Sequence, residues 1–374
     1  MNSNVPIPRR TFIHALSTSA AGAICGCTYR NDNENTATGR QLKVFNWSDY
    51  IHEDALTEFE RLTGCSVVYD NYSSDSELET RLATAAGAYD VIFPSDRALA
   101  ALLAKNLLLP LDHARLSNIR HLDPQFLAPP VDPKNRYSVP YFWGTLAVGV
   151  RVDKISTDNI GINRIEAGQG GLDVLFDARH RGRITMLDDM ENVISAALSH
   201  LGFPLNSVEL PHLAAVEQLL VAQRPLVQSY TSDAYRERLI SGEAWASLGW
   251  SGDFLQANTE LQKSGPAGAH IKTIIPVGGT MLWFDSMAIP KAAANPDLAL
   301  AFINHLLDPA IAVLNAQHVN YATPNLSAKA LLPPQVLADE SIYPSAQVLS
   351  RCSLLQNRGA DIEKIERVWR IVRA

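Results

Sequence analysis

The segment QLKVFNWSDYIHEDALTEFERLTGCSVVYD, residues 41–70, decides the fold class. Polar and apolar residues alternate from Gln41 to Phe45, which predicts a strand with NWSDY as its terminal loop. From Ile51 to Thr63 the apolar residues fall on one helical face, and Gly64 ends that helix. A second strand is expected at Ser66–Tyr69. The order strand, loop, helix, strand is typical of an α/β protein.

The same alternation continues along the chain. Helical patterns at Ser76–Ala86 and Leu99–Lys105 flank a buried strand at Tyr89–Phe93. Three strands that alternate with helices predict a mostly parallel sheet, and ligand-binding groups gather at the carboxyl ends of such strands. Trp47, Asp49 and Ser95 are expected at those ends.

The middle of the chain repeats the pattern. Strands are expected at Tyr137–Val150, Arg183–Leu187, Ala244–Leu248, Thr273–Val277 and Thr280–Phe284. Helices are expected at Val193–Leu201, Leu210–Gln223, Ser232–Ser241 and Asp297–Leu307. Two α/β regions, each with ligand-type residues at its strand ends, predict a two-lobed clamp.

Three pairs of an aromatic residue and an acid stand out, in NWSDY (46–50), GWSGD (249–253) and LWFDS (282–286). Aromatic faces attract alkylammonium groups, and carboxylates bind the same groups through charge-assisted hydrogen bonds. A site that joins these segments would suit a small organic polycation better than a phosphate, a sugar acid or a nucleic acid. A core tryptophan beside a turn aspartate explains any single pair, but three pairs at strand ends favour a binding site.

Composition is compatible with this interpretation. The chain has 374 residues, 47% hydrophobic and 19% charged, with a net charge of −7. It is long enough to bury one large core or two ordinary cores. An acidic surface argues against a nucleic-acid partner and weakly favours cationic ligands.

The N-terminus resembles an export signal. Arg9–Ile13 (RRTFI) is a twin-arginine pattern, and the weakly apolar stretch Ala15–Ile24 is too short for a permanent membrane anchor. This combination predicts export of the folded protein to the periplasm by the twin-arginine route.

A lipidation motif follows. Ile24-Cys25-Gly26-Cys27 resembles a bacterial lipobox with Cys27 as the lipidated residue, so residues 1–26 would be removed as the signal peptide. Cleavage without lipidation remains the alternative. Residues 27–40 are polar and lack periodicity, which predicts a flexible tether. The other two cysteines, Cys65 and Cys352, are expected to be free thiols.

Motifs of common enzymes are absent from the sequence. It contains no Gly-Lys-Ser/Thr loop, no His-Glu-x-x-His, no Gly-x-Ser-x-Gly and no Cys/His spacing that fits zinc. Gly168–Gly171 is expected to be a loop. Asp188-Asp189 is either a metal or acid–base pair or the N-terminal cap of the next helix. The sequence therefore predicts no enzyme, no metal and no cofactor.

From Leu42 to the C-terminal region the chain resembles the periplasmic spermidine/putrescine-binding proteins of ABC importers. The matching segments, in order, are FNWSDYI, YDVIFPSD, HLDPQFL, SVPYFWGTLAVGV, LDDMENV, GWSGDFLQAN, LWFDSMAIP, YATPN and IYPSAQVL. The resemblance implies an α/β type II periplasmic-binding-protein fold, two lobes joined by two hinge crossings. Lobe 1 would comprise 41–148 plus 286–329 and lobe 2 would comprise 149–285 plus 330–374, with crossings at Val148–Val150 and Trp283–Ser286.

The resemblance also implies a set of ligand contacts. Asp285 would hold an ammonium group deep in the cleft beside Trp283, and Trp47 and Tyr50 would flank the methylenes of the ligand. The full set is Trp47, Ser48, Asp49, Tyr50, Ser95, Asp189, Trp250, Asp253, Trp283, Asp285, Tyr321 and Gln356.

The ligand preference implied by the resemblance is mixed. Asp253 resembles the putrescine-type members, whereas Gln356 resembles the spermidine-type members. Asn192 stands where family members often have a glutamate, and Arg97 stands at a position that is usually uncharged, where a cation could reject the longest ligands. These features favour putrescine, with both polyamines expected to bind.

The expected function is that of a monomeric extracytoplasmic receptor that passes a polyamine to an inner-membrane permease and its ATPase. Three alternatives remain open: a binder of another organic cation or amino acid, a receptor that signals to a membrane partner, and an enzyme on the same fold. No nucleic-acid partner is expected.

Overall fold

The computed structural model describes residues 40–127, 129–155 and 170–374. These residues belong to one compact unit, Gly39–Ala374. The predicted signal peptide, the lipobox with Cys27 and nearly all of the tether lie outside the described residues, as do Gly168 and Gln169.

Ten strands in the described part of the chain form one mixed sheet with the main path β2-β1-β3-β9-β4-β7-β5-β6, while β8 pairs with β4 and β10 with β9. Their bounds are β1 Gln41–Trp47, β2 Ser66–Tyr72, β3 Val91–Ile92, β4 Ser138–Arg151, β5 Ile184–Met186, β6 Val227–Tyr230, β7 Ala246–Trp250, β8 Ile271–Ile274, β9 Met281–Ala288 and β10 Ser353–Leu354.

The prediction of a mostly parallel sheet is correct only at its two ends. β1 runs parallel to β2 and β3, and β5 runs parallel to β6 and β7. In the middle, β4 runs antiparallel to β7, β8 and β9, and β9 also runs antiparallel to β3. The predicted type II periplasmic-binding-protein fold matches this mixed arrangement.

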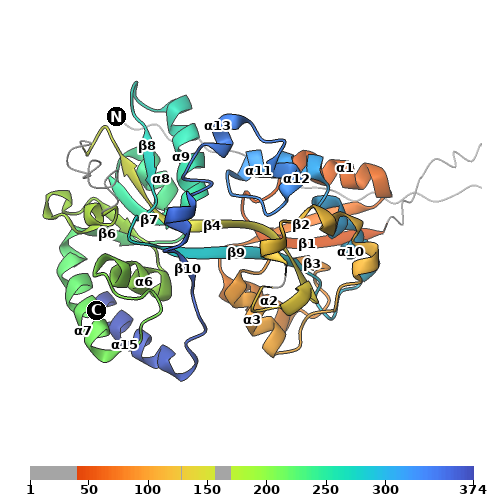
Figure 1. The fold of residues 1–374 in the computed structure, drawn as a ribbon, viewed down its shortest axis with the longest axis horizontal. Coiled ribbons are helices and arrows are strands. Elements are labelled where there is room, and N and C mark those ends of the chain that lie inside the picture. The colour runs from red at the N-terminus through yellow and green to blue at the C-terminus, as the bar shows by residue number, and fades with distance from the viewer. Residues whose placement is uncertain (1–39, 128, 156–169) are drawn as a thin grey trace, which may run out of the picture. The chain divides into compact units, whose positions relative to one another are not determined.

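The two ends of the sheet are joined by β4 and β9 (Figure 1). Every residue of β4 is buried, as expected for a strand covered on both faces. It pairs with β9 from Ser138 to Thr145 and with β7 and β8 from Leu146 to Arg151. β4 therefore changes partners ahead of the predicted crossing at Val148–Val150. The lobe boundaries themselves stay a prediction.

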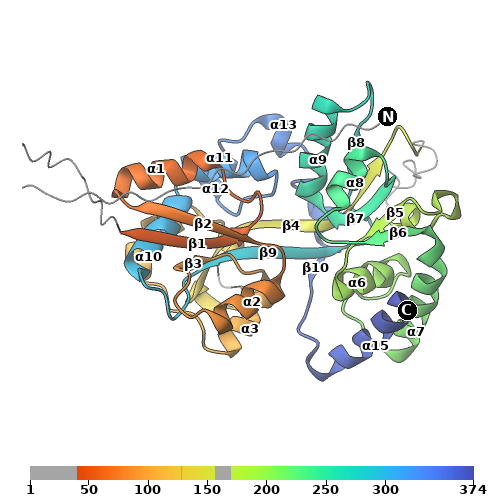
Figure 2. The same cartoon turned by 180° about the vertical axis from the view of Figure 1, so that it is seen from behind.

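Helices cover both ends of the sheet. Figures 1 and 2 show α1, α2, α3 and α10 beside β1–β3, and α6, α7, α8 and α15 at the end that contains β5 and β6. The bounds are α1 Glu53–Thr63, α2 Asp75–Thr84, α3 Asp96–Ala104, α6 Met190–His200, α7 Leu210–Gln223, α8 Tyr235–Ser241, α9 Ser251–Ser264, α10 Pro296–Leu306, α11 Pro309–Val319, α12 Leu326–Lys329, α13 Pro334–Leu337, α14 Ala346–Leu349 and α15 Ile362–Arg373. Short 3₁₀ helices span His113–Arg115, Ser117–His121, Pro124–Phe126, Pro133–Asn135, Asp173–Phe176, Ala178–His180, Arg224–Leu226 and Gly359–Asp361.

Within the described residues, no single helix is long and apolar enough to cross a membrane. The bent pair α10 and α11, with 75° between its helices, meets that test by length and composition alone.

Several predicted boundaries are wrong for identifiable reasons. β1 extends to Trp47 because Phe45–Trp47 keep the register with Asp70–Tyr72 of β2, so Trp47 belongs to the strand. β8 ends at Ile274, two residues ahead of Pro276, which has no N–H for a ladder hydrogen bond. Helix α8 begins at Tyr235 because the Thr231 hydroxyl accepts the N–H groups of the residues before it and forms a turn.

The two cysteines of the described chain are free, as predicted. Cys65 is buried, whereas Cys352 is half-buried. Burial raises the pKa of the Cys352 thiol, so the reactive thiolate is disfavoured there.

The packing of α9 on β4 supplies a stability test. A Cβ added at Gly149 of β4 would lie 2.3 Å from Cδ1 of the fully buried Phe254 of α9. We expect Gly149→Ala to lower the free energy of unfolding by about 1–3 kcal/mol, measured by urea denaturation. Gly278→Ala is the control, because no atom lies within 4 Å of its added Cβ. Equal stability of the two variants would contradict this packing.

Candidate functional site

Asp285 of β9 occupies the centre of the candidate site. It is 6% exposed, and the Tyr50 hydroxyl donates a hydrogen bond of 2.7 Å to its Oδ2. The Tyr141 hydroxyl donates to the Tyr50 carbonyl at 3.0 Å, which fixes the loop after β1. The Ser95 backbone pairs with that of Asp285 in an isolated antiparallel bridge. Residues distant in sequence therefore meet around one carboxylate.

The surroundings disfavour the charge of this carboxylate. Burial raises the pKa of Asp285 well above its usual range, and the Tyr50 hydrogen bond opposes this rise. The nearby carboxyls Asp75 and Asp96 add to it. Burial also raises the pKa of Asp96 to about 7. A cation that enters this region would stabilise the ionised carboxylate.

A chain of aromatic rings extends from this point. The Tyr321 ring lies 5.9 Å from Tyr50 and 4.9 Å from Trp283, and Trp283 lies 5.9 Å from Trp250, measured between ring centroids. All three contacts are edge-to-face. The buried Trp283 Nε1 has no hydrogen-bond partner among the described residues. The rings provide apolar and cation-attracting faces between Asp285 and Asp253.

Asp253 is the second acid of the site and lies in the first turn of α9. The hydroxyls of Tyr235 and Tyr321 each donate to one of its oxygens. Burial raises the pKa of Asp253, while Arg236 and the two hydroxyls oppose that rise. Gly252 permits this arrangement, because a Cβ there would lie 2.5 Å from the Tyr321 ring.

In the NWSDY segment, Tyr50 contacts Asp285, whereas the three residues before it have other partners or are exposed. Trp47 is half-buried, its Nε1 donates to the Phe93 carbonyl at 3.0 Å, and its ring lies 4.5 Å from Tyr72. Ser48 and Asp49 are exposed. Asp49 lies 3.7 Å from an Arg236 guanidinium nitrogen, so the loop after β1 contacts α8.

Two further predicted residues cap helices. Ser95 is the N-cap of α3 and donates from Oγ to Asp75 at 2.6 Å. Asp189 is the N-cap of α6 and accepts the Asn192 N–H at 2.9 Å, which confirms the capping interpretation for this residue. Asn192 is fully buried, and neither polar atom of its side chain has a partner in the described chain.

Gln356, like the exposed Ser48, is a predicted contact that the structure does not link to the two acids. It is exposed after β10, and its backbone N–H donates to the Asn206 side chain at 3.0 Å. No hydrogen bond among the described residues links its side chain to Asp285 or Asp253.

Six residues of this region were not singled out from the sequence. They are Asp75 and Asp96 near Asp285, Tyr141 beside Tyr50, Tyr235 and Arg236 near Asp253, and Glu191, which pairs with Arg97. Their segments follow ordinary helix or strand patterns, so no local signal separates them from surface or core residues. Glu191 lies inside the quoted LDDMENV segment, which is the nearest available signal.

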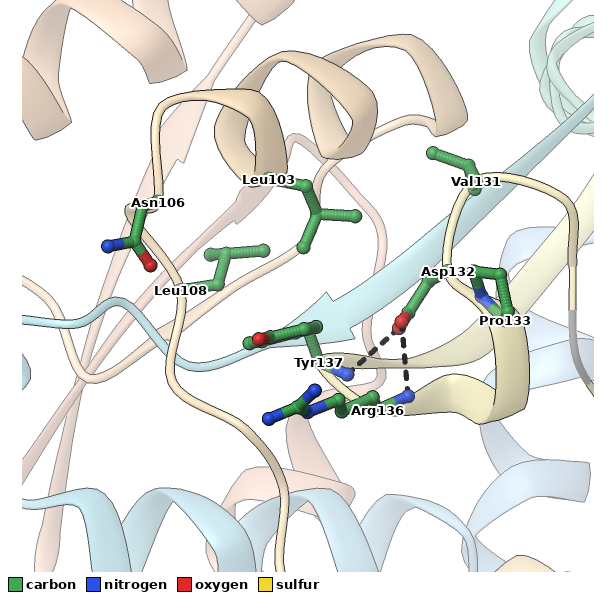
Figure 3. Close-up of a pocket in the computed structure, with 8 residues that line it drawn as sticks. All are labelled: Leu103, Asn106, Leu108, Val131, Asp132, Pro133, Arg136 and Tyr137. Atoms are coloured by element: carbon green, nitrogen blue, oxygen red, sulfur yellow. Dashed lines mark hydrogen bonds between the residues drawn. The ribbon is translucent and has the colours of Figure 1, made fainter.

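A cavity of about 350 Å³ lies elsewhere, beside β4 and the end of α3. Figure 3 shows the Asp132 carboxylate turned toward the backbone N–H groups of Arg136 and Tyr137, which donate to it at 3.1 and 2.9 Å. This acid organises a turn, and none of the predicted site residues lines the cavity.

Known proteins resemble this chain in sequence and in fold. Residues 54–343 match the family model of the bacterial extracellular solute-binding proteins. The chain belongs to this family.

A putrescine/cadaverine-binding protein of Pseudomonas aeruginosa is 34% identical over 85% of this chain and 88% of its own length. A spermidine/putrescine-binding periplasmic protein of Salmonella typhimurium is 32% identical over 90% of this chain and 91% of its own. The solved structure of a putative spermidine/putrescine ABC transporter protein of Listeria monocytogenes is 31% identical, covers 90% of this chain and 99% of its own, and superposes with a TM-score of 0.77. The predicted resemblance is confirmed.

The raised pKa of Asp285 gives a stability prediction. A carboxyl with a raised pKa in the folded state costs no stability below its unfolded pKa. The cost grows as pH rises from the unfolded pKa to the folded pKa and is constant above it. Asp285→Asn removes this charge and leaves an oxygen for the Tyr50 hydroxyl. We expect the ligand-free variant to be more stable than the natural protein by about 1–3 kcal/mol at neutral pH, with a smaller gain at about pH 4.

Urea unfolding at several pH values measures this difference. Asp233→Asn, at an exposed position, is the matched control and should change stability little at any pH. A ligand-free Asp285→Asn protein that is no more stable than the natural one near neutral pH would contradict the burial argument.

Proposed function

We propose that this protein is an extracytoplasmic receptor that binds a polyamine between the β1–β3 and β5–β7 ends of its sheet and delivers it to an ABC importer. The observation that carries the proposal is the buried Asp285, which accepts a hydrogen bond from Tyr50 beside the Trp283 and Tyr321 rings. The names of the curated relatives support the ligand class.

The chemistry of the site suits an alkyl diammonium ion. One ammonium would pair with Asp285 and the other with Asp253, and the aromatic rings between them would cover the methylenes. The two buried ammonium groups need carboxylate partners, because only such pairing offsets the free energy lost when the charges leave water. Burial raises the pKa of both acids, of Asp285 with no cation beside it among the described residues and of Asp253 in spite of the nearby Arg236.

Ligand binding is coupled to closure in this proposal. Asp285 pairs with elements at the β1–β3 end, while Asp253 belongs to α9 and accepts from Tyr235 of α8. A ligand held by both acids binds the closed arrangement better than an open one, and the difference in affinity shifts the equilibrium toward closure. The closed protein is then the form expected to dock on the permease.

The N-terminal sequence supports the rest of the proposal. The twin-arginine pattern at Arg9-Arg10 would direct export of the folded chain, and lipidation at Cys27 would hold a monomeric receptor at the membrane near its permease. The family consists of solute-binding proteins, and a receptor that releases its ligand unchanged is the role proposed here.

Calorimetric titration of the purified protein tests the ligand class. Putrescine, cadaverine and spermidine are the probes, and glutamate is the anionic comparison. We expect binding of the diamines at micromolar concentrations or below, and no binding of glutamate. Asp285→Asn should weaken diamine binding by about 2–5 kcal/mol, roughly thirtyfold or more, whereas Asp233→Asn should bind normally. Absence of binding by every polyamine would refute the proposal.

Variants of the N-terminus test export and anchoring. We expect Arg9-Arg10→Lys-Lys to leave the precursor inside the cell, because the twin-arginine pair is the export signal. Cys27→Ser should give a soluble or unprocessed protein, because the acylated thiol is lost. Fractionation of cells followed by immunoblotting measures both effects. A mature, membrane-bound Cys27→Ser product would show that Cys27 is not the anchor.

A further inference from the structure

The Arg97 side chain of α3 joins three carboxylates. Its Nη2 lies 3.0 Å from Asp189 Oδ2 and 4.0 Å from Asp75 Oδ2, and its Nη1 lies 2.8 Å from Glu191 Oε2. Asp75 belongs to α2, near β1–β3, whereas Asp189 and Glu191 belong to the start of α6 at the other end of the sheet. The guanidinium therefore connects the two ends directly.

This cluster adjoins the proposed ligand site. Ser95, two residues before Arg97, donates to Asp75 at 2.6 Å, and its backbone pairs with that of Asp285. Asp75 is also one of the acids that raise the pKa of Asp285. A polyamine anchored on Asp285 and extended toward α6 would meet the carboxylates that Arg97 already occupies.

The charges around Arg97 indicate that its side chain occupies a cation-binding position. The buried Arg358 lies 3.5 Å from the second oxygen of Glu191, so two arginines face three acids. The arginine and its three acids are only 16–33% exposed. Without Arg97, two negative charges would remain unbalanced in a shielded position, which is the environment that binds an ammonium group.

We propose that Arg97 determines the ligand specificity of this site by filling, with its own guanidinium, the position that the additional ammonium of a triamine would occupy. This inference rests on the proposed function. A triamine would have to place its third charge against the guanidinium or displace a cation held by two close ion pairs. A diamine that ends at Asp253 and Asp285 meets neither cost, so the site selects short diamines.

The decisive quantity is the ratio of the dissociation constants of spermidine and putrescine, measured by calorimetry. We expect Arg97→Gln to shift this ratio at least tenfold in favour of spermidine, equivalent to about 1.4 kcal/mol. Arg97→Lys keeps a cation in place and should retain most of the natural preference. Arg115→Gln, which removes an exposed arginine paired with Asp297, is the matched control and should leave the ratio unchanged.

A double variant tests the mechanism further. In an Arg97→Gln background, Asp189→Asn removes one of the acids that would receive the third ammonium, while asparagine preserves the α6 cap. The gain in spermidine affinity should then shrink. Thermal unfolding followed by circular dichroism confirms that each variant is folded.

The outcomes separate the possible roles of Arg97. A residue that only fastens α3 to α6 would weaken both ligands by the same factor when replaced, and that result would overturn the inference. Diamine binding by the natural protein with an unchanged ratio in Arg97→Gln would also overturn it, without touching the proposed function. Absence of polyamine binding by the natural protein would overturn both.

Discussion

The site depends on a carboxylate buried without a cation among the described residues, Asp285 in the central strand β9. Its Oδ2 accepts from Tyr50, yet burial and the carboxyls of Asp75 and Asp96 still disfavour its charge. Such a group lowers the stability of the ligand-free closed protein, and an ammonium ion repays that cost on binding. In the proposed function, the same carboxylate accounts for both the ligand class and the closure on binding.

The fold provides the means to couple these effects. β4 and β9 lie in the middle of the sheet and connect its β1–β3 end to its β5–β7 end. A ligand bound between the two ends would therefore contact parts of the protein that these two strands join. Ion pairs supplement this connection, from Asp49 to Arg236 and from Arg97 to Asp189 and Glu191. Because these pairs are partly exposed, each contributes little to stability by itself. For the Arg97 pairs, the proposed effect is on which cations the site admits.

The sequence predicts the helices and strands better than the tertiary contacts between them. The strand–helix alternation gives β1–β3 and α1–α3, and the helix 210–223 is predicted with its observed bounds. The antiparallel centre is missed because local periodicity does not specify strand order. Helix α9 is missed because Gly252 in its first turn has low helix propensity, and that turn carries Asp253. The resemblance supplies Tyr50 and Asp285, but their hydrogen bond, across 235 positions of sequence, depends on the strand order β1-β3-β9, which local patterns do not give.

Putrescine binding should release protons from the protein, because a bound ammonium lowers the raised pKa of Asp285. Calorimetric titrations at pH 7 in buffers of different ionisation enthalpy give the number of protons that leave the protein per ligand bound. A carboxyl whose pKa is raised in the ligand-free protein and lowered by a bound ammonium releases protons on binding, so we expect the apparent enthalpy to differ between a buffer of low and a buffer of high ionisation enthalpy. The difference should be smaller in Asp285→Asn, if enough binding remains to measure. Identical enthalpies for the natural protein in both buffers would contradict the account.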